Sequence, residues 1–303
     1  MNDLIHVHPS VAEALEDRAP LVALESTIIT HGMPYPDNLA MALSVEKIIA
    51  EAGATPALVA VIDGQITVGL NDEERESLAK TKSARKVSRA DLAYAAAFGE
   101  NAGTTVAATM LIANSVGIHV FATGGIGGVH KGASESFDIS ADLLELARSS
   151  VIVVAAGAKA ILDIPKTLEV LETQGVPVIG YGTDKMPAFW SQSSPWDAPL
   201  RLDSAREIAT FRKTRDGLGI EGGMLVANPI PAASDIPFEE MQGYIDAAQL
   251  DLERHDIQAK EVTPFLLGRI VELTQGRSLK SNIALVENNA KVAADIARAL
   301  AAG

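Results

Sequence analysis

The chain has 303 residues, of which 48% are apolar and 21% charged, and its formal net charge is −14. This balance is typical of a globular protein, and the negative surface argues against broad nucleic-acid binding because it repels phosphate backbones. The absence of cysteine excludes disulfides, thiolate metal sites and cysteine nucleophiles. No apolar run approaches the ~18 residues of a membrane span, and the start MNDLIHVHPS lacks the features of a secretory signal. We therefore expect a soluble, cytoplasmic protein.

Short apolar runs alternate with longer amphipathic segments along the chain, which is the pattern of an α/β protein. Ser10 and Glu13 have the spacing of a capping box and predict a short helix that ends before Pro20. The apolar, β-branched run at 21–29 predicts a buried strand. Apolar residues at helical spacing then predict an amphipathic helix over 37–52.

A hairpin is expected next, because Asp63-Gly64 suits a type I′ turn between the apolar runs 58–62 and 65–70. Since the strands of a hairpin are antiparallel, the sheet should be mixed. Further strands are predicted at 86–88, 119–123, 151–156, 176–181 and 224–230. Further helices are predicted at 72–80, 89–98, 103–116, 238–254, 262–275 and 281–301.

One long irregular stretch, 183–202, holds both tryptophans of the chain, so we expect it to be a packed functional loop or an oligomer contact. No repeat, low-complexity tract or linker divides the sequence. We therefore predict one α/β domain over residues 1–303.

Two charged residues, Glu25 and Lys159, stand in otherwise apolar segments. A carboxylate in an apolar strand is costly to bury, so Glu25 either caps the strand end or acts as a general acid with a raised pKa. Lys159, between a strand and a helix, either binds a phosphate or serves as an amine nucleophile. Desolvation in general favours the second role, because it increases the fraction of unprotonated amine.

The segment ATGGIGGVHKG (122–132) follows a predicted strand. Clustered glycines let backbone N–H groups approach an anion, and His130 and Lys131 can add side-chain donors. A plain glycine-rich turn has the same composition. The spacing is not that of a dinucleotide-binding fingerprint, so the segment does not indicate a dinucleotide cofactor.

The segment SFDISADL (136–143) offers two carboxylates, Asp138 and Asp142. If a helix starts here, the two lie four residues apart on one face, and their oxygens suit Mg²⁺ or Mn²⁺. Capping of a helix N-terminus by acidic residues explains them equally well. Ser140 between them is placed to reach a phosphate.

Two further polar residues have both a functional and an ordinary interpretation. Lys86 stands at the end of a short strand and is either a ligand contact or a solvated charge. The amide of Asn282 can donate and accept, as the edge of a pyrimidine requires, or it is simply a polar residue near a helix N-terminus.

Taken together, these segments resemble the pseudouridine-5′-phosphate glycosidases, a family that includes indigoidine synthase A-like proteins. The resemblance extends from residue 22 to residue 290 and therefore covers nearly the whole chain. The matching runs are VALESTIITHGMPYP (22–36), KVSRADL (86–92), ATGGIGGVHKGA (122–133), FDISADL (137–143), AAGAKAILD (155–163), ANPIP (227–231), TPFLL (263–267) and SLKSNIALVENNA (278–290).

The resemblance implies reversible hydrolysis of the C–C glycosidic bond of pseudouridine 5′-phosphate to uracil and ribose 5-phosphate. It also implies a three-layer α/β/α fold with a mixed, largely parallel sheet, a homotrimer, and one Mn²⁺ or similar cation per subunit. Lys159 would be the covalent nucleophile, Glu25 the proton donor and Asp138 the metal ligand. The residues implied as substrate contacts are Lys86, Val106, Thr123, His130, Ser140, Ala141, Asp142 and Asn282.

This chemistry explains the need for a lysine and an acid. The leaving atom of a C-glycoside is carbon, which must be protonated as the bond breaks. A lysine that attacks C1′ and opens the ribose ring can expel uracil with its nitrogen lone pair and leave an iminium for water to hydrolyse. The usual glycosidase pair of carboxylates provides less of this electron push.

Two rival interpretations use some of the same residues. A Schiff-base sugar-phosphate aldolase or isomerase would keep Lys159 and the anion-binding loop, but it would need no reader of a uracil edge. A non-enzymatic regulator would use Lys159 only as a counter-charge for phosphate. Membership of an indigoidine pathway is a further possibility, because the sequence carries no genomic context.

Overall fold

The structure is a computed structural model, which describes residues 4–255 and 262–302. The strands are β1 (Ile5–Val7), β2 (Leu21–Leu24), β3 (Thr55–Ile62), β4 (Gln65–Val68), β5 (Arg85–Val87), β6 (Ala102–Thr104), β7 (Val120–Ala122), β8 (Ile152–Ala155), β9 (Val178–Tyr181), β10 (Leu200–Leu202) and β11 (Met224–Ala227). The α-helices are α1 (Pro9–Glu16), α2 (Asp37–Glu51), α3 (Asp72–Lys80), α4 (Arg89–Ala97), α5 (Val106–Val116), α6 (Ala133–Ser136), α7 (Ala141–Arg148), α8 (Ile164–Thr173), α9 (Ala205–Gly217), α10 (Phe238–His255), α11 (Val262–Leu273) and α12 (Arg277–Ala301). Two short turns are the π-helical η1 (Ile28–Gly32) and the 3₁₀ η2 (Ala232–Ser234).

The strands form one mixed sheet with the order β1-β4-β3-β2-β7-β8-β11-β9-β10, and β6, with β5 beside it, also pairs with β3. The antiparallel pairs are β3 with β4 and β3 with β6, and the other pairs are parallel. The predicted hairpin is confirmed: Asp63 and Gly64 both have positive φ, at 47° and 80°, as a type I′ turn requires. The mixed, largely parallel sheet is therefore also confirmed.

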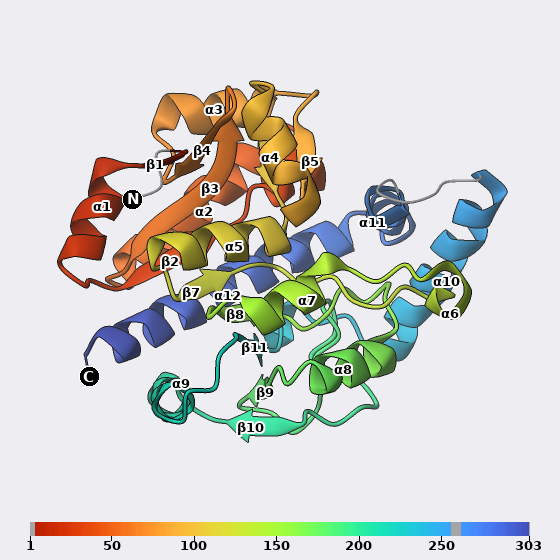
Figure 1. The fold of residues 1–303 in the computed structure, drawn as a ribbon. Coiled ribbons are helices and arrows are strands. Elements are labelled where there is room, and N and C mark those ends of the chain that lie inside the picture. The colour runs from red at the N-terminus through yellow and green to blue at the C-terminus, as the bar shows by residue number, and fades with distance from the viewer. Residues whose placement is uncertain (1–3, 256–261, 303) are drawn as a thin grey trace.

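Helices cover both faces of this sheet (Figure 1). On one face α12 packs across β2, β7 and β8 and contacts α2 and α9. On the other face α5 lies against β2 and β3, and α7 packs between α5 and α8. The implied three-layer α/β/α architecture is confirmed. Among residues 4–255 and 262–302, no helix combines the length and apolarity needed to span a membrane.

The central strands are buried on both faces, which is why their sequences are continuously apolar. Every residue of β2, β8 and β11 is buried. Removing such side chains from water is the main stabilising contribution to a fold, at roughly 25 cal/mol per Å² of apolar surface. The buried strands therefore hold the residues that directly follow them in defined positions.

The predicted strand at 21–29 is wrong in its second half. β2 ends at Leu24, and the chain then turns into the π-helical segment η1. The reason is polar: the Ser26 hydroxyl donates to the carbonyl of Val59 at 2.7 Å and accepts from the N–H of Thr104 at 2.9 Å. Side-chain bonds of this kind compete with a strand ladder, so Glu25 lies just beyond the strand and not inside it.

Two further strand predictions are corrected: the strand predicted at 224–230 ends at Ala227, and residues 200–202 of the predicted irregular stretch form β10. Several helix starts also differ from the predicted ones. The cap of α1 is His8 and not Ser10, because the His8 ring accepts the Ser10 N–H at 3.3 Å. The helix predicted from 103 begins at Val106, since the preceding residues form β6 and Thr105 is the N-cap. The last helix begins at Arg277, four residues before its predicted start.

The loop predicted to be packed does pack. Trp190 is 2% exposed, its ring lies edge-on to Phe189, and its Nε1–H donates to the carbonyl of Ser278 at 3.0 Å. Trp196 makes a second edge contact with Phe238. An oligomer contact through this loop stays a prediction.

Candidate active site

Three parallel neighbours in the sheet, β2, β7 and β8, end at the same edge. Glu25 follows the last residue of β2, Thr123 follows β7, and Lys159 lies shortly beyond β8. In the sheet, β3 is the neighbour of β2 on one side and β7 is its neighbour on the other side, so the strand order changes direction at β2. Ligand sites in open α/β sheets form at such switch points, outside the carboxyl ends of the strands.

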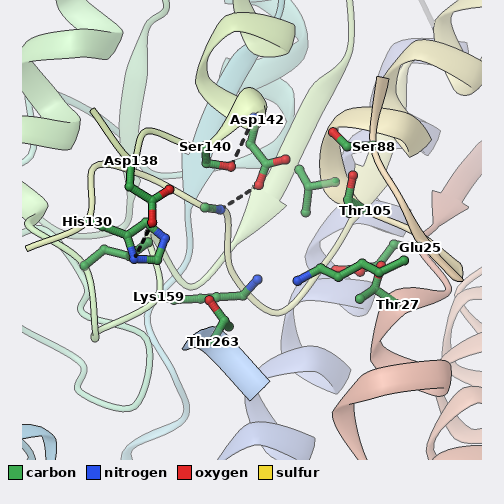
Figure 2. Close-up of a pocket in the computed structure, with 14 residues that line it drawn as sticks. Glu25, Thr27, Ser88, Thr105, His130, Asp138, Ser140, Asp142, Lys159 and Thr263 are labelled. Atoms are coloured by element: carbon green, nitrogen blue, oxygen red, sulfur yellow. Dashed lines mark hydrogen bonds and ion pairs between the residues drawn. The ribbon is translucent and has the colours of Figure 1, made fainter. Parts of the chain in front are cut away.

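A cavity of about 290 Å³ lies at this edge. Figure 2 shows Lys159 reaching into it between Asp138 and His130 on one side and Glu25 and Thr27 on the other. Eight of the residues singled out from the sequence line it: Glu25, Lys86, Val106, His130, Asp138, Ser140, Asp142 and Lys159. The other lining residues are Thr27, Ser88, Thr105, Gly127, Leu162 and Thr263.

The environment of Glu25 favours its protonated form. Burial raises the pKa of the Glu25 carboxyl above its usual value, and the neighbouring Lys159 charge lowers it only in part. The Thr123 hydroxyl donates to Glu25 Oε1 at 2.5 Å, which also lowers the pKa, while Asp142 raises it. Because the net shift is upward, this carboxyl retains its proton to a higher pH than an exposed glutamate and suits a general acid.

A smaller hollow of about 60 Å³ adjoins the cavity and shares Glu25 and Lys159 with it. It also shares Thr27, Lys86 and Thr263 with the cavity. The rest of its lining combines apolar residues and glycines with one histidine: Ile28, His31, Gly32, Gly124, Gly125, Phe189, Pro264 and Leu267. Asn282 also lines it, and the buried Asn282 Oδ1 has no hydrogen-bond partner in the part of the chain that the structure describes. A buried amide oxygen without a partner is costly, so this slot is suited to a ligand that offers an N–H. We call it the amide slot.

Three helices begin at the wall of the main cavity. Ser88, Thr105 and Ser140 are the N-cap residues of α4, α5 and α7, and all three line it. Helix N-termini carry partial positive charge and unpaired N–H groups, which favour anions. Lys86, on β5 just before α4, adds a cation to the same wall. This end of the cavity is therefore suited to a phosphate.

Asp142 does not share a helix face with Asp138, because α7 begins only at Ala141. The buried Asp142 carboxylate accepts the N–H of Ala107 at 2.9 Å and that of Gly127 at 2.7 Å. It thereby joins the start of α5, the start of α7 and the glycine-rich segment. A Cβ on Gly127 would stand 2.3 Å from Ser140 Oγ, so this glycine permits close packing. Its N–H, one of the expected anion donors, is used internally.

Asp138 stands at the cavity rim, with 47% of its side chain exposed and its Oδ2 3.9 Å from His130 Nδ1. Burial lowers the pKa of His130, an effect that Asp138 partly opposes. Within the described ranges, no group of three or more His, Asp or Glu side chains is arranged to hold a metal. A hard divalent cation at Asp138 would therefore take most of its ligands from water or substrate, which such ions accept.

Three residues singled out from the sequence lie outside the main cavity lining. The Thr123 hydroxyl donates a hydrogen bond to the Glu25 carboxyl, Asn282 lines the amide slot, and Ala141 is the first residue of α7. Lys131, considered as an anion donor, instead pairs with Asp246 of α10 at 3.4 Å.

Sequence reasoning missed several lining residues, and two of them had a signal. Ser88 and Thr105 each precede a helix and belong to residue types preferred at N-caps, so a helix-start analysis would have identified them. Thr263, at the start of α11, has no comparable signal, because only the tertiary fold brings that helix to the cavity.

The family model described as indigoidine synthase A like protein matches residues 10–299. The pseudouridine-5′-phosphate glycosidase of Mesorhizobium japonicum is 67% identical over 296 residues, which cover 98% of this chain and 97% of that protein. The enzyme of the same name from Geobacillus kaustophilus is 53% identical over 99% of this chain and 100% of its own length.

Solved structures are similar over the same extent. An indigoidine synthase A-like protein from Thermotoga maritima has 34% identity and a TM-score of 0.89, over 98% of this chain and 96% of the other. The prealnumycin C-glycosynthase AlnA, in complex with ribulose 5-phosphate, has 35% identity and a TM-score of 0.92, over 100% of this chain and 98% of the other.

Proposed function

Because this chain belongs to the family of indigoidine synthase A-like proteins, we infer that it is an enzyme that hydrolyses the C–C glycosidic bond of pseudouridine 5′-phosphate. The products are uracil and ribose 5-phosphate. The observation that carries this inference is one continuous site in which Glu25 and Lys159 lie between the amide slot and a wall of helix N-termini. These three parts correspond to the scissile bond, the base and the phosphate.

Uracil suits the amide slot. Its ring is planar and largely apolar on its faces, and apolar side chains together with Gly124 and Gly125 make up much of the slot's lining. The Asn282 Oδ1 that has no described partner would accept a uracil N–H, and its NH₂ group would donate to an adjacent uracil carbonyl. Binding the base would therefore satisfy a buried polar atom.

The phosphate suits the opposite wall. The starts of α4, α5 and α7 present backbone N–H groups, and Lys86 adds a positive charge. With base and phosphate at the two ends, C1′ of the ribose would lie near Lys159. In this arrangement Val106 and the Ser140-Ala141-Asp142 run contact the substrate at the helix starts, and His130 contacts it from the side of Asp138.

We propose that Lys159 is the nucleophile. Its nitrogen bonds to C1′ as the C1′–O4′ bond breaks, and the proton that this nitrogen then loses is taken up by O4′, which leaves an open ribose chain and an amine with a lone pair. The nitrogen lone pair then forms a C1′=N bond and expels uracil, while Glu25 delivers its proton to uracil C5. Water adds to the resulting iminium, and collapse of that adduct releases ribose 5-phosphate and the free lysine. The reverse sequence forms the C–C bond.

Glu25 suits the acid role because the leaving atom is carbon. A carbon leaving group has no lone pair that water can protonate before the bond breaks, so the acid must be in place and still protonated. The hydrogen bond from Thr123 holds the Glu25 carboxyl in place, and the raised pKa of Glu25 keeps it protonated.

We propose that Asp138 holds a divalent manganese ion, with water and substrate oxygens completing its shell. When bound, this ion supplies positive charge beside the phosphate. Treatment with a chelator should then lower activity, and Mn²⁺ should restore it better than Zn²⁺. Asp138→Asn should raise the Mn²⁺ concentration needed for half-maximal rate. Full activity after chelation would mean that Asp138 is not a metal ligand.

We also propose a homotrimer, which analytical ultracentrifugation would detect as a species of three times 31.8 kDa. The cytoplasmic location stays a prediction.

The decisive test of the function is release of uracil from pseudouridine 5′-phosphate by the purified protein. A Schiff-base aldolase would release no uracil, and a regulator would bind the compound without turnover. Borohydride reduction during turnover should in addition trap a ribose phosphate adduct on Lys159, because hydride reduces an iminium to a stable amine. Absence of uracil release under all metal conditions would refute the proposal.

A further inference from the structure

We propose that Arg89 and Glu145 form a positioning pair, which fixes the start of α4 relative to α7 and thereby sets the affinity for the substrate's phosphate. The inference rests on the proposed function, which assigns the phosphate to the helix N-termini. Neither residue lines the cavity, so both act through the residues that do.

The pair has the geometry of a strong interaction. Arg89 Nε donates to Glu145 Oε2 at 2.6 Å and its second nitrogen donates to Oε1 at 2.9 Å. The hydroxyl of Ser149 also donates to Glu145 Oε1, at 2.5 Å. Only 2% of the Glu145 side chain is exposed, whereas 42% of the Arg89 side chain is exposed. Bidentate contacts of this kind hold orientation as well as charge.

The Arg89–Glu145 pair lies close to a helix start that lines the cavity. Arg89 directly follows Ser88, the cap of α4, and Glu145 lies one turn into α7, beyond its cap Ser140. The Asp142 carboxylate already joins α5 to α7. The Arg89–Glu145 bridge is the corresponding connection for α4, whose main helical neighbour is α5. One carboxylate thus joins the starts of α5 and α7, and a second joins the start of α4 to the middle of α7.

The burial of Glu145 makes the pair asymmetric. Removal of Arg89 would leave a buried carboxylate without its charged partner, close behind the start of a helix that receives an anion. The remaining negative charge and the loosened α4 would both weaken phosphate binding. Replacing both residues by neutral ones would remove the charge, so the double variant should be less impaired than the single Arg89 variant.

Arg85 offers a matched control. It makes a bidentate pair with Glu100, which follows the C-terminal end of α4 and is more exposed than Glu145, and its guanidinium also lies over the Tyr94 ring. Neither Arg85 nor Glu100 lines the cavity. Arg85→Met therefore removes an arginine–glutamate bridge of the same type without touching the helix starts.

The experiment compares Arg89→Met, Arg89→Met/Glu145→Gln and Arg85→Met with the unmodified protein. For Arg89→Met we expect the KM of pseudouridine 5′-phosphate and the Kd of ribose 5-phosphate to rise about tenfold. We expect kcat to stay within about twofold and the Kd of uracil to stay unchanged. The double variant should recover part of the loss, and Arg85→Met should behave as the unmodified protein.

Specific results would overturn the inference. One is an unchanged Kd for ribose 5-phosphate in Arg89→Met. The other is an equal rise in the Kd values of uracil and ribose 5-phosphate, which would indicate general damage to the site. If Arg89→Met does not fold, Arg89→Lys keeps the charge and loses the bidentate contact, and its Kd for ribose 5-phosphate should rise while that for uracil does not. Because the ligand-binding measurements need no turnover, absence of uracil release by the unmodified protein would refute the proposed function separately.

Discussion

The two walls of the cavity are built in different ways. The wall at the strand ends presents side chains, Glu25 and Lys159, whose chemistry is individual. The opposite wall consists of the starts of α4, α5 and α7, where the groups proposed to bind the phosphate are backbone N–H donors that the protein does not itself use. A side chain can be removed by one substitution, whereas a backbone donor can only be displaced. The strand wall should therefore control the rate of bond breaking, and the helix wall should control binding.

The carboxyl groups of the two walls, Glu25 and Asp142, have different surroundings. Glu25 has a hydroxyl and nearby charges around it, and its pKa is raised by burial. Asp142 accepts two backbone N–H bonds and has a structural role in joining helix starts. The same functional group thus has surroundings that suit an acid in one wall, and it joins helix starts in the other, because the neighbouring donors differ.

The largest effect is expected at Lys159. Lys159→Ala should reduce turnover about 10⁴-fold or more, since the proposed mechanism takes the ring-opening amine from Lys159 and assigns Lys86, the other lysine of the cavity lining, to the phosphate. Lys159→Arg should fail as well, because a guanidinium stays protonated and is not nucleophilic. Uracil release measures the loss, and thermal unfolding checks that the fold is retained. A fully active Lys159→Ala protein would contradict the covalent mechanism.

The next effect separates the acid from the nucleophile within the strand wall. Glu25→Gln keeps the shape of the side chain but removes the proton, so turnover should fall about 10²–10⁴-fold. Because the lysine can still open the ring, the variant should accumulate an adduct that contains both sugar and uracil. Intact-mass measurement after addition of substrate should show the protein heavier by one whole substrate.

Two results would change this assignment. Normal turnover by Glu25→Gln would mean that another group protonates uracil, and a variant without adduct would mean that Glu25 is also needed for ring opening. In the unmodified protein, activity should fall on the alkaline side as Glu25 ionises at its raised pKa. Because other groups of the site also affect a pH profile, the mass measurement decides the assignment.

The sequence predicted the strand wall better than the helix wall, and the reason is physical. Glu25 and Lys159 are conspicuous because a charge in an apolar run is costly, and that cost is visible in the sequence itself. The type I′ turn at Asp63-Gly64 was likewise predictable, because its backbone demands are local.

The helix wall depends on contacts between distant segments. Asp138 and Asp142 appeared to share a helix face, but Ser140 caps α7 and separates them. The role of Asp142 depends on Ala107 and Gly127, which no local pattern connects to it. The strand at 21–29 was overextended for the same reason, because Ser26 bonds to the distant β3 and β6.

The third effect tests the amide slot. Asn282→Ala should lower kcat/KM for pseudouridine 5′-phosphate about tenfold and weaken uracil binding, because it removes the only polar reader proposed for the base edge. The Kd of ribose 5-phosphate should not change. Asn288→Ala is the matched control, since Asn288 lies on the same helix and donates to the carbonyl of Pro229. Equal loss of affinity for uracil and ribose 5-phosphate would argue against a base-specific slot.

The smallest effect concerns the stability of the strand wall. The pKa of Glu25 is raised in the folded protein, so above the ordinary glutamate pKa of 4.5 the unfolded chain binds fewer protons at this site than the folded one. The free energy of unfolding therefore loses a contribution as the pH rises from 4.5 through the raised pKa. Glu25→Gln cannot ionise and lacks this loss, so the difference in unfolding free energy between variant and unmodified protein should grow in favour of the variant as the pH increases. Chemical denaturation at several pH values measures it, with the exposed Glu13→Gln as control for the lost charge. A difference that does not vary with pH would mean that Glu25 ionises equally well in both states.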